Sequence, residues 1–265
     1  GFVGSPDVFV GIIDGGLQLD HPDLAANIWT NPGEVPGNGI DDDGNGYVDD
    51  VQGWNFALED FNGDGEVDDN EVKGNNNPRP VVDGLTEEEK EGNVFSHGTV
   101  VAGIIGAVGN NEQDGAGINW KVKLMNVKVL DNSGIGFLDN MPAAIRYAAD
   151  NGAHVINISI VGGTQLDELD AALKYAYDKG VFVAVASGND YLDLNSTRMY
   201  PVCSDTDSKV GFVIGTGAVD KDHYAAEFSN TGSDCVDIAA PGVGINSTIR
   251  YSPKNGLKDS YGYGW

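Results

Sequence analysis

The chain has 265 residues, of which 40% are hydrophobic and 21% are charged. This length and composition are sufficient for one globular domain with a sizeable core. The 41 acidic residues outnumber the 15 basic residues, and the formal net charge is −26. Such a charge argues against nucleic acid as a partner, because the phosphate backbone would be repelled. Since no run of about eighteen apolar residues occurs, the sequence predicts no membrane span.

The predicted elements begin with a strand over residues 8–13, an apolar β-branched run that ends at Asp14. Residues 37–93 are polar and rich in Gly, Asn, Asp and Pro, which indicates a loop insertion. A helical apolar stripe follows His97. We expect Asp139 to cap a second helix, and Thr164 with Asp167 to form a capping box on a third. Further strands are predicted at 122–130, 155–159, 181–186, 212–219 and 236–240.

Alternating strands and helices favour one fold class. They predict an α/β fold, a three-layer, doubly wound and mostly parallel sheet with helices on both faces. We expect a single domain over residues 1–265 that contains the insertion at 37–93. In such a sheet, functional residues gather at the carboxyl ends of the strands.

Three polar residues stand at positions where the carboxyl ends of the strands are expected to meet. Asp14 closes the first strand, His97 begins a helix, and Asn189 follows the strand that ends at Ala186. A carboxylate, an imidazole and an amide donor together indicate nucleophilic acyl transfer. In that chemistry the carboxylate orients the imidazole, the imidazole takes a proton from the nucleophile, and the amide stabilises the oxyanion.

Five sequence segments, in this order, resemble the subtilase family of serine proteases. They are IIDGG with HPDL from residue 12, SHGT with AGIIG from residue 96, ASGN from residue 186, FSNTG from residue 228 and AAPGV from residue 239. The resemblance implies a subtilisin-like fold and a serine endopeptidase activity. It also implies that Asp14 holds His97, that His97 is the general base and acid, and that Asn189 is the oxyanion donor.

The resemblance further implies two segments that pair with the substrate backbone, comprising Gly134, Ile135 and Gly136, and Ser159, Ile160 and Gly162. Strand addition of this kind favours polypeptide substrates in an extended conformation, and an inhibitory propeptide is a second candidate partner. The chain departs from the family pattern at Gly15, where Ser or Thr is usual, and at Val100, where a second histidine is usual. An extra residue after Ser159 shifts the register of that segment.

The family's Gly-Thr-Ser-Met segment is absent, and the chain stops at Trp265, about where it would begin. We therefore expect a sequence that is incomplete at both ends, a nucleophilic serine beyond residue 265, and no activity in the chain as given. The alternative is a catalytically dead, calcium-binding module that holds peptides. The endopeptidase would be secreted or extracellular. Cys203 and Cys235 fit a disulfide and a pair of buried free thiols equally well.

The acidic insertion contains two candidate calcium loops. The first matches the twelve-residue calcium-loop pattern at its oxygen positions, with ligands Asp60, Asn62, Asp64, Asp68 and Glu71. The second is looser and offers Asp41, Asp43, Asn45 and Asp49. The prolines that follow the first loop exclude a long helix, so neither loop is expected to act as a sensor. The competing interpretation is a solvated acidic surface without bound calcium.

Overall fold

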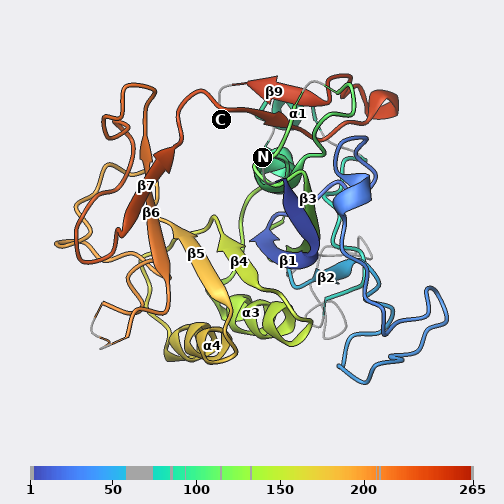
Figure 1. Ribbon diagram of the computed structural model, residues 1–265, viewed down its shortest axis with the longest axis horizontal. Coiled ribbons are helices and arrows are strands. Elements are labelled where there is room, and N and C mark those ends of the chain that lie inside the picture. Colours follow the sequence, from blue (N-terminus) through green and yellow to red (C-terminus); the bar gives the residue numbers. More distant parts are fainter. Residues whose placement is uncertain are drawn as a thin grey trace.

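The structure is a computed structural model that describes residues 3–57, 74–83, 86–92, 94–113, 115–131, 133–206, 208 and 210–263. Its centre is a seven-stranded sheet of order β2-β3-β1-β4-β5-β6-β7, in which every neighbouring pair is parallel (Figure 1). The strands are β1 Gly4–Asp14, β2 Gly53–Asn55, β3 Lys121–Lys128, β4 Val155–Ile158, β5 Phe182–Ala186, β6 Ile214–Val219 and β7 Ile238–Pro241.

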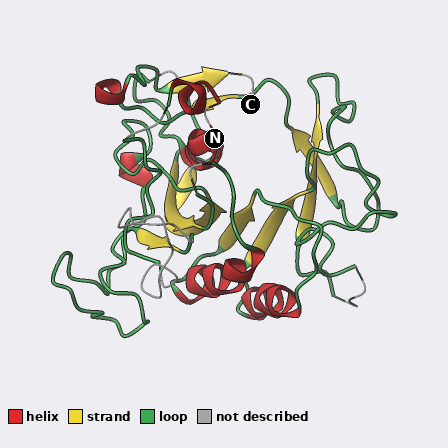
Figure 2. Ribbon diagram, turned by 180° about the vertical axis from the view of Figure 1, so that it is seen from behind, coloured by secondary structure: helices red, strands yellow, loops and turns green. Residues whose placement is uncertain are grey.

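Helices cover both faces of this sheet (Figure 2). The helix α2, His97–Gly106, packs on one face, where Ile12 and Leu124 share a buried cluster with Ala102. The helices α3, Met141–Asp150, and α4, Asp167–Asp178, pack on the other face. There Ile13, the next residue along β1, is buried with side chains of both helices. The alternation of Ile12 and Ile13 follows from the two-residue period of a strand. The structure confirms the predicted three-layer α/β class.

The smaller elements lie around these layers. The helix α1 spans Glu87–Gly92, and an antiparallel pair is formed by β8, Asn246–Thr248, and β9, Tyr261–Tyr263. Short 3₁₀ helices occur at Ala25–Asn27, Val94–Ser96, Leu138–Asn140 and Pro253–Asn255. No helix within the described ranges is both long and apolar enough to cross a membrane.

The predicted helix caps are wrong. Asp139 lies inside a 3₁₀ turn, and α3 begins after Asn140 without a side-chain cap. The helix α4 begins at Asp167 instead of Thr164, and no side-chain hydrogen bond caps it. Its first turn carries Asp167, Glu168 and Asp170, whose negative charges interact favourably with the positive end of the helix dipole. Charge therefore supports this helix start in place of a capping box.

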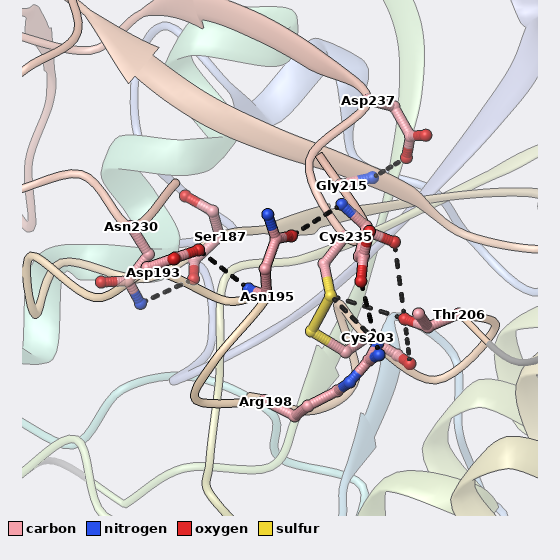
Figure 3. Close-up of a disulfide and its surroundings, with 11 residues drawn as sticks. Ser187, Asp193, Asn195, Arg198, Cys203, Thr206, Gly215, Asn230, Cys235 and Asp237 are labelled. Carbon is pink, nitrogen blue, oxygen red and sulfur yellow. Dashed lines mark hydrogen bonds and ion pairs between the residues drawn. A yellow bond between two sulfur atoms is a disulfide. The ribbon is translucent and has the colours of Figure 1, made fainter. Parts of the chain in front are cut away.

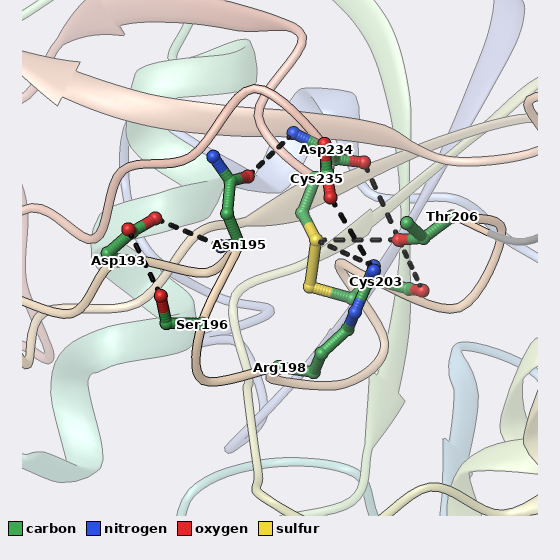
Figure 4. Close-up of polar contacts among 8 residues, drawn as sticks. All are labelled: Asp193, Asn195, Ser196, Arg198, Cys203, Thr206, Asp234 and Cys235. Carbon is green, nitrogen blue, oxygen red and sulfur yellow. Dashed lines mark hydrogen bonds and ion pairs between the residues drawn. A yellow bond between two sulfur atoms is a disulfide. The ribbon is translucent and has the colours of Figure 1, made fainter.

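The two cysteines form a disulfide, which decides between the two alternatives that the sequence allowed. Cys203 and Cys235 are bonded across 32 residues, and each is 3% exposed (Figure 3). Their Sγ atoms join the loop after β5 to the connection between β6 and β7. The guanidinium group of Arg198 lies 3.5 Å from Asp234 beside this bridge (Figure 4).

Candidate active site

The last residue of β1 supplies a buried carboxylate. Asp14 is 0% exposed, and its Oδ1 accepts a hydrogen bond of 2.7 Å from the backbone N–H of Gly15. On the neighbouring strand it is in register with Lys128. Asp14 therefore has a hydrogen-bond donor at position 15 even though this residue is neither Ser nor Thr, because the backbone N–H of Gly15 donates to it.

The first residue of α2 places an imidazole against this carboxylate. The Nδ1 atom of His97 lies 2.9 Å from both side-chain oxygens of Asp14. Gly98 allows this close approach, since a Cβ at that position would collide with the carbonyl oxygen of Gly16. The His97 side chain is 42% exposed, and no described residue forms a hydrogen bond with its Nε2. One ring nitrogen is thus fixed and the other is available to a reacting group.

The pKa of His97 is set by two opposing effects. Burial is the largest effect and lowers this pKa, but the hydrogen bond and the negative charge of Asp14 raise it. The net result is a His97 pKa above its ordinary value of 6.5. A base with a pKa near the working pH suits proton transfer. Because the Asp14 contact uses Nδ1, the proton would be exchanged at Nε2.

Asn189 lies at the same edge of the sheet, in the loop that follows β5. The strands β1 and β5 are the two neighbours of β4, so Asp14 and Asn189 follow strands that are separated by one strand only. The side chain of Asn189 is exposed and borders a cavity of about 360 Å³. Ser159 and Ser187 line the same cavity. Within the described residues, no hydrogen bond occupies the side-chain amide of Asn189.

The two predicted substrate segments flank this region unequally. The side chain of Ile135 is 63% exposed, but both of its backbone groups bind Asp131: its N–H donates to the carboxylate at 2.9 Å, and its carbonyl accepts from the backbone N–H at 2.8 Å. Gly136 forms an isolated bridge with Leu130. Gly162 uses both of its backbone groups on Tyr200, at 2.8 and 2.7 Å. The backbone groups of Ile135 and Gly162 are therefore unavailable to a substrate.

Ser159 and Ile160, which begin the second predicted substrate segment, have a different environment from Gly162. Ser159 follows β4 and its hydroxyl accepts a hydrogen bond of 3.0 Å from Asn157. Ile160 packs against the main hydrophobic core. In the first segment, the backbone N–H of Gly134 donates to the carbonyl of Asp131 at 3.1 Å. Ser159 and Ile160 thus remain the better placed residues for pairing with a substrate.

The second predicted calcium loop forms a cluster of oxygen atoms, with one member that the pattern did not include. Oxygens of Glu34, Asp41 and Asp43 all lie within 4.8 Å of one another. Glu34 is 7% exposed and stands outside the regular loop spacing, so spacing could not identify it. Carboxylate oxygens are the ligands that Ca²⁺ prefers. The donor set therefore fits this ion.

Two other predicted ligands have different surroundings. The amide of Asn45 donates to Asp43 at 3.1 Å, which keeps Asn45 beside the cluster. The carboxylate of Asp49 instead accepts hydrogen bonds from the backbone N–H groups of Asn38 and Gly39, at 3.1 and 2.9 Å. Asp49 thus closes the tip of the loop. The ligands predicted for the first loop, Asp60, Asn62, Asp64, Asp68 and Glu71, lie outside the described residues.

Buried polar contacts attach the acidic loop to the core. Asp50 is 0% exposed and accepts a hydrogen bond of 2.7 Å from the hydroxyl of Tyr147 on α3. It also accepts one of 2.8 Å from Asn31. Burial raises the pKa of Asp50, an effect that these hydrogen bonds oppose and that the nearby charge of Asp43 increases. A cation near the loop would favour its ionised form.

Comparisons with known proteins point to one protein family. The family model described as "Subtilase family" matches residues 5–265. A cell wall-associated protease of Bacillus subtilis (strain 168) is 47% identical over 153 residues, which is 58% of this chain and 16% of that protein. A thermophilic serine proteinase of Bacillus sp. (strain AK1) is 41% identical over 61% of this chain and 38% of that protein. An intracellular serine protease of Paenibacillus polymyxa is 30% identical over 91% of this chain and 58% of that protein.

A solved structure gives the same result for the fold. A cold-adapted subtilisin-like serine proteinase matches with a TM-score of 0.64 at 23% identity, over 99% of this chain and 70% of that one. This likeness supports the α/β arrangement. The chain spans less than two thirds of the length of each of the three sequence relatives named above.

Proposed function

The chain belongs to the subtilase family, and we propose that it forms most of the catalytic domain of a serine endopeptidase whose nucleophilic serine follows residue 265. The observation that carries the proposal is the contact between His97 Nδ1 and both oxygens of Asp14, at 2.9 Å. This contact leaves Nε2 for the nucleophile. Without the serine segment, residues 1–265 would not hydrolyse peptides.

The proposed reaction divides the work among three described residues and the serine. His97 Nε2 takes the proton of the serine hydroxyl while the serine oxygen attacks the carbonyl carbon of the scissile bond. Asp14 stays ionised and stabilises the imidazolium that forms. Asn189 donates a hydrogen bond to the oxyanion of the tetrahedral intermediate. His97 then returns the proton to the leaving amine, and water releases the acyl group by the same steps.

We propose that the substrate is an extended polypeptide that pairs with the backbone at Ser159–Ile160 and contacts the exposed side chain of Ile135. The exposure of Ile135 and the position of Ser159 on the Asn189 cavity support this choice. Strand addition requires a substrate segment without its own regular structure. An inhibitory propeptide that binds to the same segments is the corresponding partner proposal.

We also propose that calcium is a structural ligand held by Glu34, Asp41 and Asp43. Their oxygens are close enough together to share one ion, and a bound dication would relieve the repulsion among their charges. When bound, the ion would stabilise the folded loop by mass action. It would take no part in the hydrolysis, which uses His97 and Asp14.

For the cellular location we propose export. The Cys203–Cys235 disulfide supports it, because disulfides form and persist mainly in oxidising compartments. Thiol titration of the protein isolated under thiol-blocking conditions is the check: export predicts no free thiol, and two free thiols would contradict it.

Hydrolysis of an unstructured peptide by the full-length protein tests the proposed activity. The wild type should cleave internal bonds, as mass spectrometry of the products would show, and His97→Ala should lose this activity. The matched control is His223→Ala, which removes an exposed histidine on the loop after β6 and should leave cleavage unchanged. Peptide binding without cleavage by the wild type would favour the dead, peptide-binding module instead.

A further inference from the structure

The loop that carries Asn189 has no regular secondary structure of its own to hold it. Residues 187–192 follow β5 and run beside residues 228–231. An oxyanion donor must nevertheless be held within a fraction of an ångström, because its contribution depends on preorganised geometry. Something outside the loop therefore has to fix its backbone.

Asn230 forms four hydrogen bonds with the loop that carries Asn189, three through its side chain and one through its backbone N–H. Its Nδ2 donates to the carbonyl of Ser187 at 2.9 Å (Figure 3). Its Oδ1 accepts from the backbone N–H groups of Asp190, at 3.0 Å, and Leu192, at 2.8 Å. The backbone N–H of Asn230 donates to the carbonyl of Gly188 at 3.0 Å. Two of these partners precede Asn189 and two follow it.

The space around this side chain is closed. Asn230 is 0% exposed. Gly188 has a φ of +98°, and a Cβ there would lie 2.5 Å from Asn230 Nδ2. Only glycine fits easily at a position that combines a left-handed φ with so close a neighbour. The Gly188 backbone and the Asn230 amide are therefore fitted to each other immediately before Asn189.

Asn230 is itself anchored to the sheet. The hydroxyl of Ser229 donates to the carbonyl of Asn230 at 3.1 Å, and it accepts from the backbone N–H of Ala218 on β6 at 3.0 Å. Farther along the same loop, Asn195 donates its backbone N–H to Asp193 and accepts from the backbone N–H of Asp234, each at 3.0 Å (Figure 4). Direct backbone bonds also hold this loop, such as those from Tyr191 to Phe228, at 3.0 Å, and from Leu194 to Thr231, at 2.7 Å. Within the described residues, Asn230 is the residue that bonds to the loop on both sides of Asn189.

We propose that Asn230 is a positioning residue for the oxyanion site, which it serves by clamping the backbone on both sides of Asn189. The inference rests on the proposed function, since it assigns Asn189 the oxyanion role. Asn230 is not assigned a contact with the reacting atoms: its carboxamide binds the backbone of Ser187, Asp190 and Leu192. An ordinary buried asparagine would affect stability alone, whereas this clamp controls the rate of the chemical step through Asn189.

A double-mutant cycle in the full-length protein tests the clamp. Asn189→Ala should lower kcat by about 10²–10³-fold, as loss of an oxyanion donor does elsewhere. Asn230→Ala should lower kcat by at least about tenfold with little change in KM. If Asn230 acts through Asn189, the double variant should be no more than about threefold slower than Asn189→Ala. Effects that multiply, or an unchanged kcat in folded Asn230→Ala, would overturn the proposal.

The matched control is Asn27→Ala. Asn27 is 7% exposed and donates from its side chain to the carbonyls of Gly106, at 2.8 Å, and Trp120, at 3.0 Å, away from Asn189. This variant should lose stability but keep kcat per folded molecule. If it lowers kcat as much as Asn230→Ala does, the effect of Asn230 is general destabilisation and the clamp is refuted.

Hydrogen exchange tests the clamp without any measurement of activity. It therefore applies even if Asn230→Ala does not fold or if the wild type does not hydrolyse peptides. Asn230→Leu keeps a branched side chain of similar size but removes both the acceptor for the Asp190 and Leu192 amides and the donor to Ser187. Native-state hydrogen exchange should show faster exchange at the Asp190 and Leu192 amides in this variant, with amides of β4 unchanged. Unchanged exchange at these two amides would contradict the clamp, whereas an inactive wild type with a normal exchange pattern would contradict only the proposed function.

Discussion

The end of β1 holds one buried carboxylate and the acidic loop at residues 34–50 holds several, and the two regions balance the negative charge differently. Asp14 is fully buried, and the protein supplies its partners, the N–H of Gly15 and the imidazole of His97. In the acidic loop, Glu34, Asp41 and Asp43 share a small volume, and no Lys or Arg in the described part of the chain forms an ion pair with them. Asp14 is thus paired with a side chain that can carry a positive charge, whereas the described partners of the acidic cluster are neutral N–H groups. This difference supports the proposed calcium ion at the cluster.

The largest expected effect concerns the partner of His97. Asp14→Asn in the full-length protein should lower kcat by about 10⁴-fold, because an amide cannot hold the imidazole in the required tautomer or stabilise its charge. The KM for a peptide substrate should change little, since Asp14 does not reach the substrate. Steady-state kinetics measure both. A loss below tenfold would show that His97 does not depend on Asp14.

The disulfide gives the next largest effect and acts on stability. Replacing both Cys203 and Cys235 by Ala opens a loop that the bond closes over 32 residues. Chain entropy then predicts a loss of about 3–4 kcal/mol in the free energy of unfolding. Guanidinium denaturation of the oxidised wild type and the double variant measures it. Equal stabilities would mean that the bridge adds nothing to the loop contacts around it.

Calcium should have a smaller effect, which distinguishes the acidic loop from the Asp14 site. Chelation should lower the melting temperature, because an ion at 100 times its Kd stabilises by about 2.7 kcal/mol. Asp43→Asn should weaken calcium binding about tenfold or more, as measured by titration calorimetry. Asp42→Asn is the control, since Asp42 serves the backbone of Val35 and the side chain of Asn38. Equal affinities in the two variants would remove Asp43 from the site.

The smallest expected effect is a shift in pH dependence. The general base must be neutral, and the pKa of His97 is raised above 6.5, so kcat/KM should rise with pH through a midpoint above this value. The charged pair formed by His97 and Asp14 should stabilise the fold below about pH 6.5. This contribution should disappear as the pH increases through the raised pKa. A kinetic midpoint below 6.5 would contradict the stabilising role of Asp14.

Local patterns in the sequence predicted much of the fold and part of the site. The strand ending at Asp14 and the helix beginning at His97 could be located from apolar periodicity, and the rule that functional residues gather at strand ends placed them together. The helix start at Asp167 was missed, because a capping box and a run of acidic residues are similar in sequence. Glu34 and Asn230 were missed because the residues that they contact lie 7 to 43 positions away in the sequence. Such contacts depend on how loops fold back, which spacing does not encode.

The proposed function requires that Asp14 and His97 activate a serine beyond residue 265. A fluorophosphonate probe that reacts with activated serines tests it most directly, with the labelled residue located by mass spectrometry in the full-length protein. We expect one labelled serine after residue 265, with labelling lost in His97→Ala and retained in His223→Ala. An unlabelled wild type, or labelling that does not depend on His97, would contradict it.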